Sequence, residues 1–184
     1  MAGWVWVVVW AVALAVPMTL LAAGHLLALP IPAADVVERK TAAFDLRVTH
    51  VLSGDCGCSI QIARWLAERD DVGGDAVLWV GPHDEAADAL VAAGYAMTRI
   101  DGDDLFAEHG ITGTPCLLIH DADNALRYRG GYAPRRPVSP SDLADRSLLA
   151  RIAAGERVEQ HPAFGCASYG PTREQLDPFE LKRR

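Results

Sequence analysis

The chain has 184 residues, of which 51% are hydrophobic and 22% are charged, and its formal net charge is −7. Once an apolar N-terminal block is set aside, this length and composition indicate one globular domain with a substantial core. The negative charge argues against a nucleic-acid-binding protein, which needs a basic surface. Four cysteines are too few for a disulfide-scaffolded miniprotein. Two of them lie one residue apart, which points to redox or metal chemistry.

An uncharged segment from Trp4 to Leu29 is long enough to cross a bilayer. Three tryptophans gather near its start, where interfacial aromatic side chains belong. The alternative is a cleaved signal peptide, with Ala22-Ala23-Gly24 as its cleavage site. No Lys or Arg precedes the segment, which weakens that alternative. We therefore predict a single-pass N-terminal membrane anchor over residues 1–30, with membrane contact through residues 4–29.

The rest of the chain divides into three predicted parts. These are a linker over residues 31–41, an α/β domain over residues 42–156 and an irregular tail over residues 157–184. Arg39 and Lys40 follow the anchor and nothing basic precedes it, so the positive-inside rule alone would place the domain in the cytoplasm. The thiol chemistry described below favours the extracytoplasmic side instead, and we predict that location.

In the predicted domain, strands alternate with helices. Short apolar runs bounded by glycine or turn residues predict strands, and amphipathic runs closed by glycine predict helices. In chain order we expect a strand at 44–52, a helix at 58–70, a strand at 76–80, a helix at 84–93, a strand at 96–101, a helical turn at 103–109, a hairpin of 116–120 with 125–129, and a helix at 142–154 capped by Ser141. This order predicts a central mixed sheet flanked by helices, parallel in part, with the hairpin as an antiparallel edge.

Cys56 and Cys58 are separated by one glycine, between a predicted strand and a predicted helix. In a regular helix their side chains would point to nearly opposite faces, so Cys56 must precede the helix and Cys58 must lie in its first turn. The unpaired N–H groups and the positive end of the helix dipole lower the pKa of a thiol there, although Asp55 opposes a second negative charge. Gly57 permits the folded backbone that a Cys56–Cys58 bridge requires. Such a small ring is strained, and its disulfide should be labile.

Thr114 and Pro115 stand directly before an apolar strand. A proline cannot lie in the middle of a central strand, but at a strand entrance it is well placed for a cis peptide bond. An ordinary trans turn proline is the alternative.

Together, these features resemble the thioredoxin superfamily. A strand leads to a cysteine pair at a helix start, and Gly110-Ile111-Thr112-Gly113-Thr114-Pro115 opens a hairpin. The resemblance covers residues 44–154 and is closest to the membrane-tethered, extracytoplasmic proteins related to cytochrome-c-maturation thioredoxins. It implies a thioredoxin-like fold in which a cis Pro115 lies against the cysteine pair. It also implies that the Thr114 backbone binds a substrate segment.

The resemblance further implies a thiol–disulfide oxidoreductase in which Cys56 attacks and Cys58 resolves the mixed disulfide. No dissociable cofactor is needed. The substrate would be a protein thiol or disulfide, and a second thiol protein would be the redox partner. The family usually has Cys-x-x-Cys, whereas this chain has Cys-x-Cys. A monothiol site formed by Cys56 with Ser59 is an alternative.

Two further cysteines are accessory candidates. Cys116 follows the predicted cis proline and is either a buried strand residue or a neighbour of the pair. Cys166 lies in the tail, where its thiol would be free, bridge to Cys116 or fold back onto the active site.

A rival hypothesis is a thioredoxin-like metal-binding protein or copper chaperone. Cys56 and Cys58, with Cys116 or Cys166, would offer thiolates, and His50 or His161 an imidazole. This is a ligand set suited to Cu(I) or Zn(II). A peroxidase reading of Ser53-Gly54-Asp55-Cys56 and a redox-inactive binding module on the same fold are further alternatives. We therefore predict that the protein is a thiol–disulfide oxidoreductase, and we assign no metal ligands.

Overall fold

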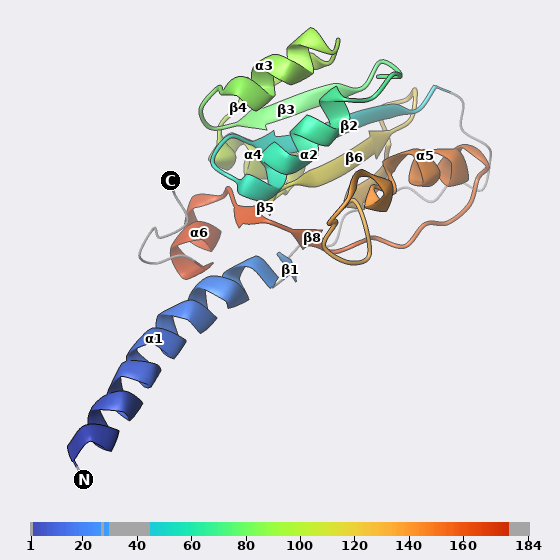
Figure 1. The fold of residues 1–184 in the computed structure, drawn as a ribbon. Helices are drawn as coiled ribbons and strands as arrows, with labels where there is room; N and C mark the ends of the chain where they lie inside the picture. The colour runs from blue at the N-terminus through green and yellow to red at the C-terminus, as the bar shows by residue number, and fades with distance from the viewer. Residues whose placement is uncertain (1, 27, 30–44, 177–184) are drawn as a thin grey trace.

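The computed structural model describes residues 2–26, 28–29 and 45–176 (Figure 1). The predicted linker at 31–41, the start of the first predicted strand and the last eight residues of the predicted tail lie outside these residues. The larger elements are α1 (Ala2–Leu26), β2 (Arg47–Ser53), α2 (Gly57–Ala67), β3 (Ala76–Val80), α3 (Glu85–Ala92), β4 (Ala96–Ile100), α4 (Gly102–His109), β6 (Cys116–His120), β7 (Leu126–Gly130), α5 (Asp145–Ala153) and α6 (Gly170–Leu176). The shorter ones are β1 (Ala28–Leu29), β5 (Gly113–Thr114), β8 (Ala163–Phe164), β9 (Cys166–Ala167) and a 3₁₀ turn, η1 (Pro140–Asp142).

A five-stranded mixed sheet with the order β4-β3-β2-β6-β7 forms the centre of the domain. Strands β2, β3 and β4 are parallel, while β6 runs antiparallel to β2 and β7 antiparallel to β6. In the central strand, Val51 pairs with Leu78 on one side and with Cys116 on the other. The predicted parallel portion and the antiparallel hairpin edge are both confirmed.

Alternating residues of β2 enter two separate cores, because successive side chains of a strand point to opposite faces. On one face Leu52 belongs to the core that also contains Trp79 and residues of α2, α3 and α5. On the other face Val51 packs in a smaller core with Leu105 of α4. Helices therefore cover both faces of the sheet (Figure 1). The cysteine pair follows shortly after the carboxyl end of the buried central strand β2.

The last predicted helix begins later than the sequence suggests. Ser139, not Ser141, caps the 3₁₀ turn η1, and the Asp142 carboxylate accepts hydrogen bonds from the backbone N–H groups of Val138 and Ser139. Leu143 then takes an extended backbone conformation, with φ −72° and ψ 112°. The chain therefore cannot continue as one helix, and α5 starts at Asp145.

The tail is not irregular in its described part. It contains the strands β8 and β9 and the helix α6. Strand β8 pairs antiparallel with β1, and β9 pairs antiparallel with β5. Each of these strands has two residues, so neither has a local periodicity that a sequence pattern would reveal. The tail folds back across the domain toward the segment that precedes β6.

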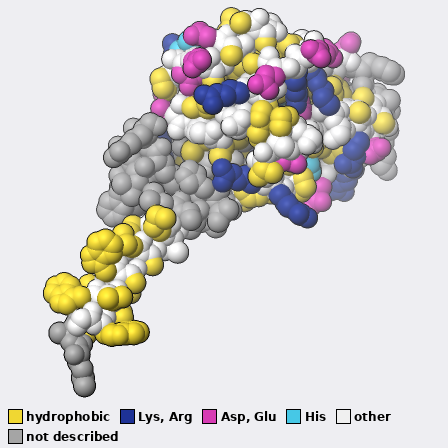
Figure 2. All heavy atoms as spheres, in the orientation of Figure 1, with side chains coloured by type: hydrophobic (Ala, Val, Ile, Leu, Met, Phe, Trp, Pro, Cys, Tyr) yellow, Lys and Arg dark blue, Asp and Glu magenta, His cyan; other side chains and the backbone are white. Residues whose placement is uncertain are grey.

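Helix α1 projects from the domain (Figure 1) and carries exposed apolar side chains, among them Trp4, Trp6 and Trp10 (Figure 2). Judged on the described residues alone, the structure holds no helix that is both long and apolar enough for a membrane crossing. The membrane anchor at residues 1–30 therefore stays a prediction.

Candidate functional site

Cys56 lies at the junction of the central strand and helix α2. It is the N-cap residue of α2, with an extended backbone at φ −119° and ψ 111°, and Cys58 lies in the first turn of the helix. The backbone carbonyl of Cys56 accepts the helical hydrogen bond from the Ile60 N–H at 2.9 Å. The sequence predicted this placement of the two thiols on either side of the helix start.

The Thr114–Pro115 segment lies against this pair. The Thr114–Pro115 peptide bond is cis, as predicted. The Cys56 Sγ atom lies 3.5 Å from the Thr114 carbonyl oxygen, to which its thiol donates when protonated. The fold thus brings together two predicted site elements that are nearly sixty residues apart in the chain.

Cys166 is the third thiol at this place. It lies in β9 directly opposite Thr114, in antiparallel register. The Cys56 Sγ atom lies against the carbonyl oxygen of the same Thr114 residue, so the two cysteines lie on either side of one strand residue. Of the three fates that the sequence left open for Cys166, the structure shows the return to the active site.

The pKa values of Cys56 and Cys58 are shifted in opposite directions. Donation from Cys166, and then from Cys58, holds the pKa of Cys56 well below the usual thiol range, although burial acts in the opposite direction. The pKa of Cys58 is raised, first because its proton is held by the Cys56 sulfur and second because of burial. The pKa of Cys56 is thus shifted toward the thiolate form and the pKa of Cys58 toward the thiol form.

The cysteine with the lowered pKa is also the least exposed to solvent. Cys56 has an exposed fraction of 0%, whereas Cys58 and Cys166 are partly exposed. Cys56, to which the thioredoxin resemblance assigns the attack, is therefore the buried member of the three. The most acidic sulfur of the site is the one that an external disulfide cannot reach directly in this conformation.

Arg136 is a site residue that the sequence analysis missed. It lies in the exposed loop between β7 and η1, and its guanidinium acts on the Cys58 thiol by charge and by a hydrogen bond, both of which lower the pKa of Cys58. The only sequence signal was an Arg- and Pro-rich loop, which on its own predicts nothing about a thiol.

Cys116 belongs to the core. It is 1% exposed, and its thiol donates to the Gly130 carbonyl oxygen at 3.3 Å. Burial raises the pKa of Cys116 to about 12. Such a thiol is protonated at neutral pH and is a poor nucleophile and metal ligand. The reading of Cys116 as a buried strand residue is therefore the one that the structure supports.

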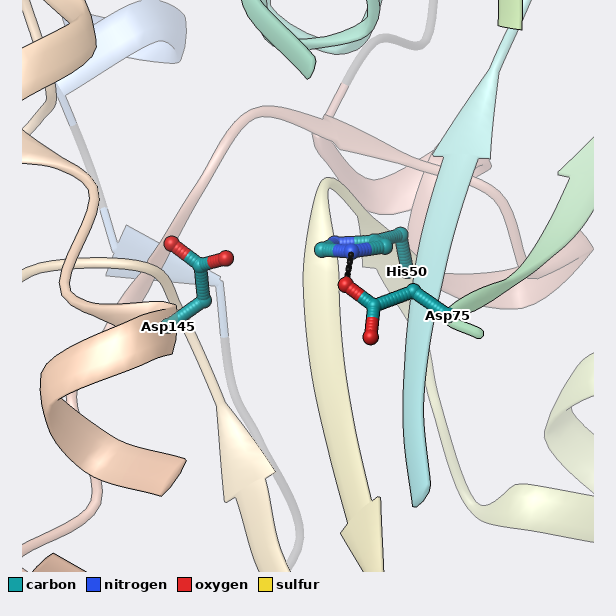
Figure 3. A group of neighbouring side chains, drawn as sticks. All are labelled: His50, Asp75 and Asp145. Carbon is teal, nitrogen blue, oxygen red and sulfur yellow. Dashed lines mark hydrogen bonds and ion pairs between the residues drawn. The ribbon is translucent and has the colours of Figure 1, made fainter. Parts of the chain in front are cut away.

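A second polar cluster lies beneath α5 (Figure 3). His50, Asp75 and Asp145 are all buried, and among the described residues they form the group of potential ligands whose donor atoms all lie within 4.8 Å of one another. His50 Nδ1 lies 2.8 Å from the Tyr132 hydroxyl, and its Nε2 lies 3.2 Å from Asp75 Oδ2. Asp145 accepts two hydrogen bonds from the Arg69 guanidinium.

Two arginines already occupy the carboxylates of this cluster. Arg69 binds Asp145 in bidentate fashion, and Arg146 lies 3.2 Å from Asp75. Burial by itself raises the pKa of Asp145. The hydrogen bonds and the charge of Arg69 together lower this pKa by more than burial raises it, so the net pKa is below the usual value. A cation entering here would meet two guanidinium groups. The cluster is better explained as a buried ion-pair network that fixes α5 against the sheet.

The thiols do not form a comparable ligand set. Among the described residues, no cysteine belongs to a group of three potential ligands with all donor atoms within 4.8 Å. His50 is committed to Tyr132 and Asp75, and His161 packs edge-on against Tyr128.

No protein-family model and no curated protein matches this chain. Among solved structures, a hypothetical protein from Sinorhizobium meliloti 1021 matches with a TM-score of 0.54 and 18% identity, over 79% of this chain and 98% of the other. An uncharacterised conserved protein from Geobacillus kaustophilus matches with a TM-score of 0.52 and 18% identity, over 71% and 79%. A thioredoxin-like protein from Aeropyrum pernix matches at 0.39 and 13% identity, over 75% and 96%. The first two likenesses concern the fold alone, and the mixed sheet flanked by helices is consistent with a thioredoxin-like fold.

Proposed function

We propose that this protein is a thiol–disulfide oxidoreductase whose reactive pair is Cys56 and Cys58. The observation that carries the proposal is the position of Cys56 at the N-cap of α2, with Cys58 in the first turn of that helix and with the Cys56 Sγ atom 3.5 Å from the carbonyl oxygen of Thr114 in the cis Thr114–Pro115 segment. A thiolate is the attacking species in disulfide exchange, and an adjacent protonated thiol is the group needed to resolve a mixed disulfide.

The exchange needs only the chain's own sulfur atoms. In a conformation that uncovers Cys56, its thiolate attacks the disulfide of a protein substrate, forms a mixed disulfide and releases one substrate thiolate. Cys58 then attacks the Cys56 sulfur, forms the Cys56–Cys58 bridge and releases the second substrate thiolate. The substrate gains two electrons and the protein loses two. A second thiol protein would return the pair to its starting state, and under other conditions the same steps run in reverse.

A substrate segment would bind to the Thr114 backbone by taking the place of β9, which pairs with it in this structure. Thr114 is 1% exposed, and its carbonyl oxygen is within hydrogen-bond distance of the Cys56 thiol. A strand that pairs with Thr114 brings its own side chain to the Cys56 sulfur, as β9 does. A substrate cysteine in such a strand would be correctly placed for exchange.

Anchoring to a membrane is a further part of the proposal. The exposed Trp and Val side chains along α1 support it, because such an apolar surface is costly in water (Figure 2). A redox-active dithiol is used most readily outside the reducing cytoplasm, so we place the domain on the extracytoplasmic side. Membrane fractionation tests the anchor. Labelling of intact cells with a membrane-impermeant maleimide tests the side.

The experiment that tests the function is insulin reduction by the full chain in the presence of a thiol reductant. The proposal predicts activity that is lost in Cys56→Ser, lowered in Cys58→Ser, and retained in Cys116→Ala, the matched cysteine control outside the pair. Equal activity in the wild type and in the Cys56→Ser variant would contradict the proposal.

A further inference from the structure

The segment that covers Cys56 is part of the protein's own tail. Strand β9 pairs with β5, and the register sets Cys166 opposite Thr114 and Ala167 opposite Gly113. The backbone N–H groups of Ser168 and Tyr169 both donate to the Thr112 carbonyl oxygen, at 2.9 and 3.2 Å. The tail is thus bound along the whole length of the segment that precedes Pro115.

Gly165 shows how close this contact is. A Cβ atom added at Gly165 would lie 1.9 Å from the Thr114 carbonyl oxygen and 2.5 Å from Pro115 Cδ. Only a residue without a side chain allows the tail to pass here, directly before Cys166. The approach that brings Cys166 to Cys56 is therefore built into the backbone.

We propose that Cys166 is a third redox thiol of this site, through which the buried Cys56 exchanges disulfides with the exterior. This inference rests on the proposed oxidoreductase function and deepens it. Its basis is the position of both cysteines at Thr114, which pairs with Cys166 and whose carbonyl oxygen lies 3.5 Å from Cys56 Sγ, together with the partial exposure of Cys166 and the full burial of Cys56.

The exchange balances as follows. The Cys166 thiolate attacks an external disulfide RSSR, forms a Cys166–SR bond and releases RS⁻. The Cys56 thiolate then attacks the Cys166 sulfur, forms the Cys56–Cys166 bond and releases the second RS⁻. The proton of the Cys166 thiol passes to the first RS⁻, and the second RS⁻ takes up a proton from the solvent, because Cys56 reacts as a thiolate. The protein loses two electrons and the external disulfide gains two.

Cys58 completes the sequence. Its thiolate attacks the Cys56 sulfur of the Cys56–Cys166 bridge, forms Cys56–Cys58 and returns Cys166 to the thiol. Cys56 and Cys166 belong to separate segments that meet at Thr114, so their bridge does not close the small and strained ring that a bridge between residues two apart closes.

The test uses the full chain in detergent, oxidised glutathione as the probe, and peptide mapping by mass spectrometry under non-reducing conditions. In Cys58→Ser the proposal predicts a peptide linked through Cys56 and Cys166. In Cys166→Ser, and in Cys166→Ala as a second variant, it predicts that formation of the Cys56–Cys58 bridge slows by about tenfold or more, because the exposed entry thiol is gone. Cys116→Ala serves as the control and should behave as the wild type.

The outcomes separate this inference from the proposed function. If Cys58→Ser yields only glutathione adducts and Cys166→Ser oxidises at the wild-type rate, the third-thiol role is wrong while the oxidoreductase function stands. If the wild-type chain forms no disulfide that includes Cys56, the proposed function itself fails.

Discussion

Cys166 lies opposite Thr114 in antiparallel register, so a strand of the protein's own tail occupies the backbone that flanks the cysteine pair. This pairing sets the partly exposed Cys166 beside Thr114, whose carbonyl oxygen lies 3.5 Å from the sulfur of the buried Cys56. The first two predictions test whether the tail limits access to Cys56 and whether Cys166 sets its acidity.

The first prediction concerns access to Cys56. Gly165→Ala should push the tail away from Thr114, because the added Cβ would overlap the Thr114 carbonyl oxygen. We expect faster alkylation of Cys56 by iodoacetamide, by about tenfold, as measured by mass spectrometry. Gly170→Ala is the control in the same tail, since its Cβ would meet Asp103 Oδ1 at an ordinary 3.5 Å. Equal rates in the two variants would show that the tail does not limit access.

The second prediction concerns the acidity of Cys56. Cys166→Ala removes the largest hydrogen-bond contribution that stabilises the Cys56 thiolate, so the pKa of Cys56 should rise. A hydrogen bond to a charged group contributes about 1.5–3 kcal/mol, which corresponds to a rise of about one to two pH units. Titration of the thiolate ultraviolet absorbance measures it, with Cys56→Ala identifying the step. A titration curve unchanged by Cys166→Ala would mean that this hydrogen bond does not set the acidity.

The third prediction concerns Arg136, whose charge and hydrogen bond lower the pKa of Cys58. Arg136→Gln should raise that pKa further and reduce the thiolate fraction of Cys58 at neutral pH. Because the arginine is exposed, we expect only a two- to fivefold slower alkylation of Cys58, roughly the effect of a surface charge pair, and a smaller one at high salt. Arg135→Gln, the neighbouring exposed arginine, is the control. Equal slowing by both variants would indicate a general charge effect.

Much of the architecture follows from local patterns in the sequence. The buried run Ala76–Val80, the glycine closures of the helices and the strand entrance at Pro115 each carry a local signal, and the structure confirms them. The position of Cys56 before the helix follows from side-chain geometry alone. These features are predictable because the residues that determine them are neighbours in the chain.

The rest of the site depends on contacts that no local pattern encodes. Cys166 reaches Thr114 through a two-residue strand, and Arg136 reaches Cys58 from a loop. The same holds for the buried network, in which Asp145 reaches Arg69 from 76 residues away along the chain. From the sequence, Asp145 reads as one more polar residue of an amphipathic helix, because its ion pair is visible only in three dimensions.

The fourth prediction concerns this network. Asp145→Asn leaves the Arg69 charge half-buried without its carboxylate, and breaking such a pair costs about 3–5 kcal/mol of unfolding free energy. The folded-state pKa of Asp145 is lowered, so its stabilising contribution is present above the unfolded-state pKa of about 4 and is lost as the pH falls through the folded-state value. Urea unfolding as a function of pH should therefore show the wild type and Asp145→Asn converging in acid.

The matched control for the network is Asp88→Asn. Its carboxylate is 74% exposed and contacts only a part-exposed histidine, His83, among the interactions described. We expect a change in unfolding free energy below about 1 kcal/mol. A loss at Asp88 as large as that at Asp145 would contradict the assignment of the buried pair as the stabilising one.

The central claim is that the Cys56 thiolate exchanges disulfides within its own site, and a glutathione redox titration of the full chain tests it most directly. Differential alkylation and mass spectrometry would follow each of the four cysteines across the titration. The account predicts that Cys56 converts to a disulfide at a defined potential, together with Cys58 or Cys166, while Cys116 stays a thiol throughout. A Cys56 that remains a thiol, or carries only glutathione, across the whole range would contradict it.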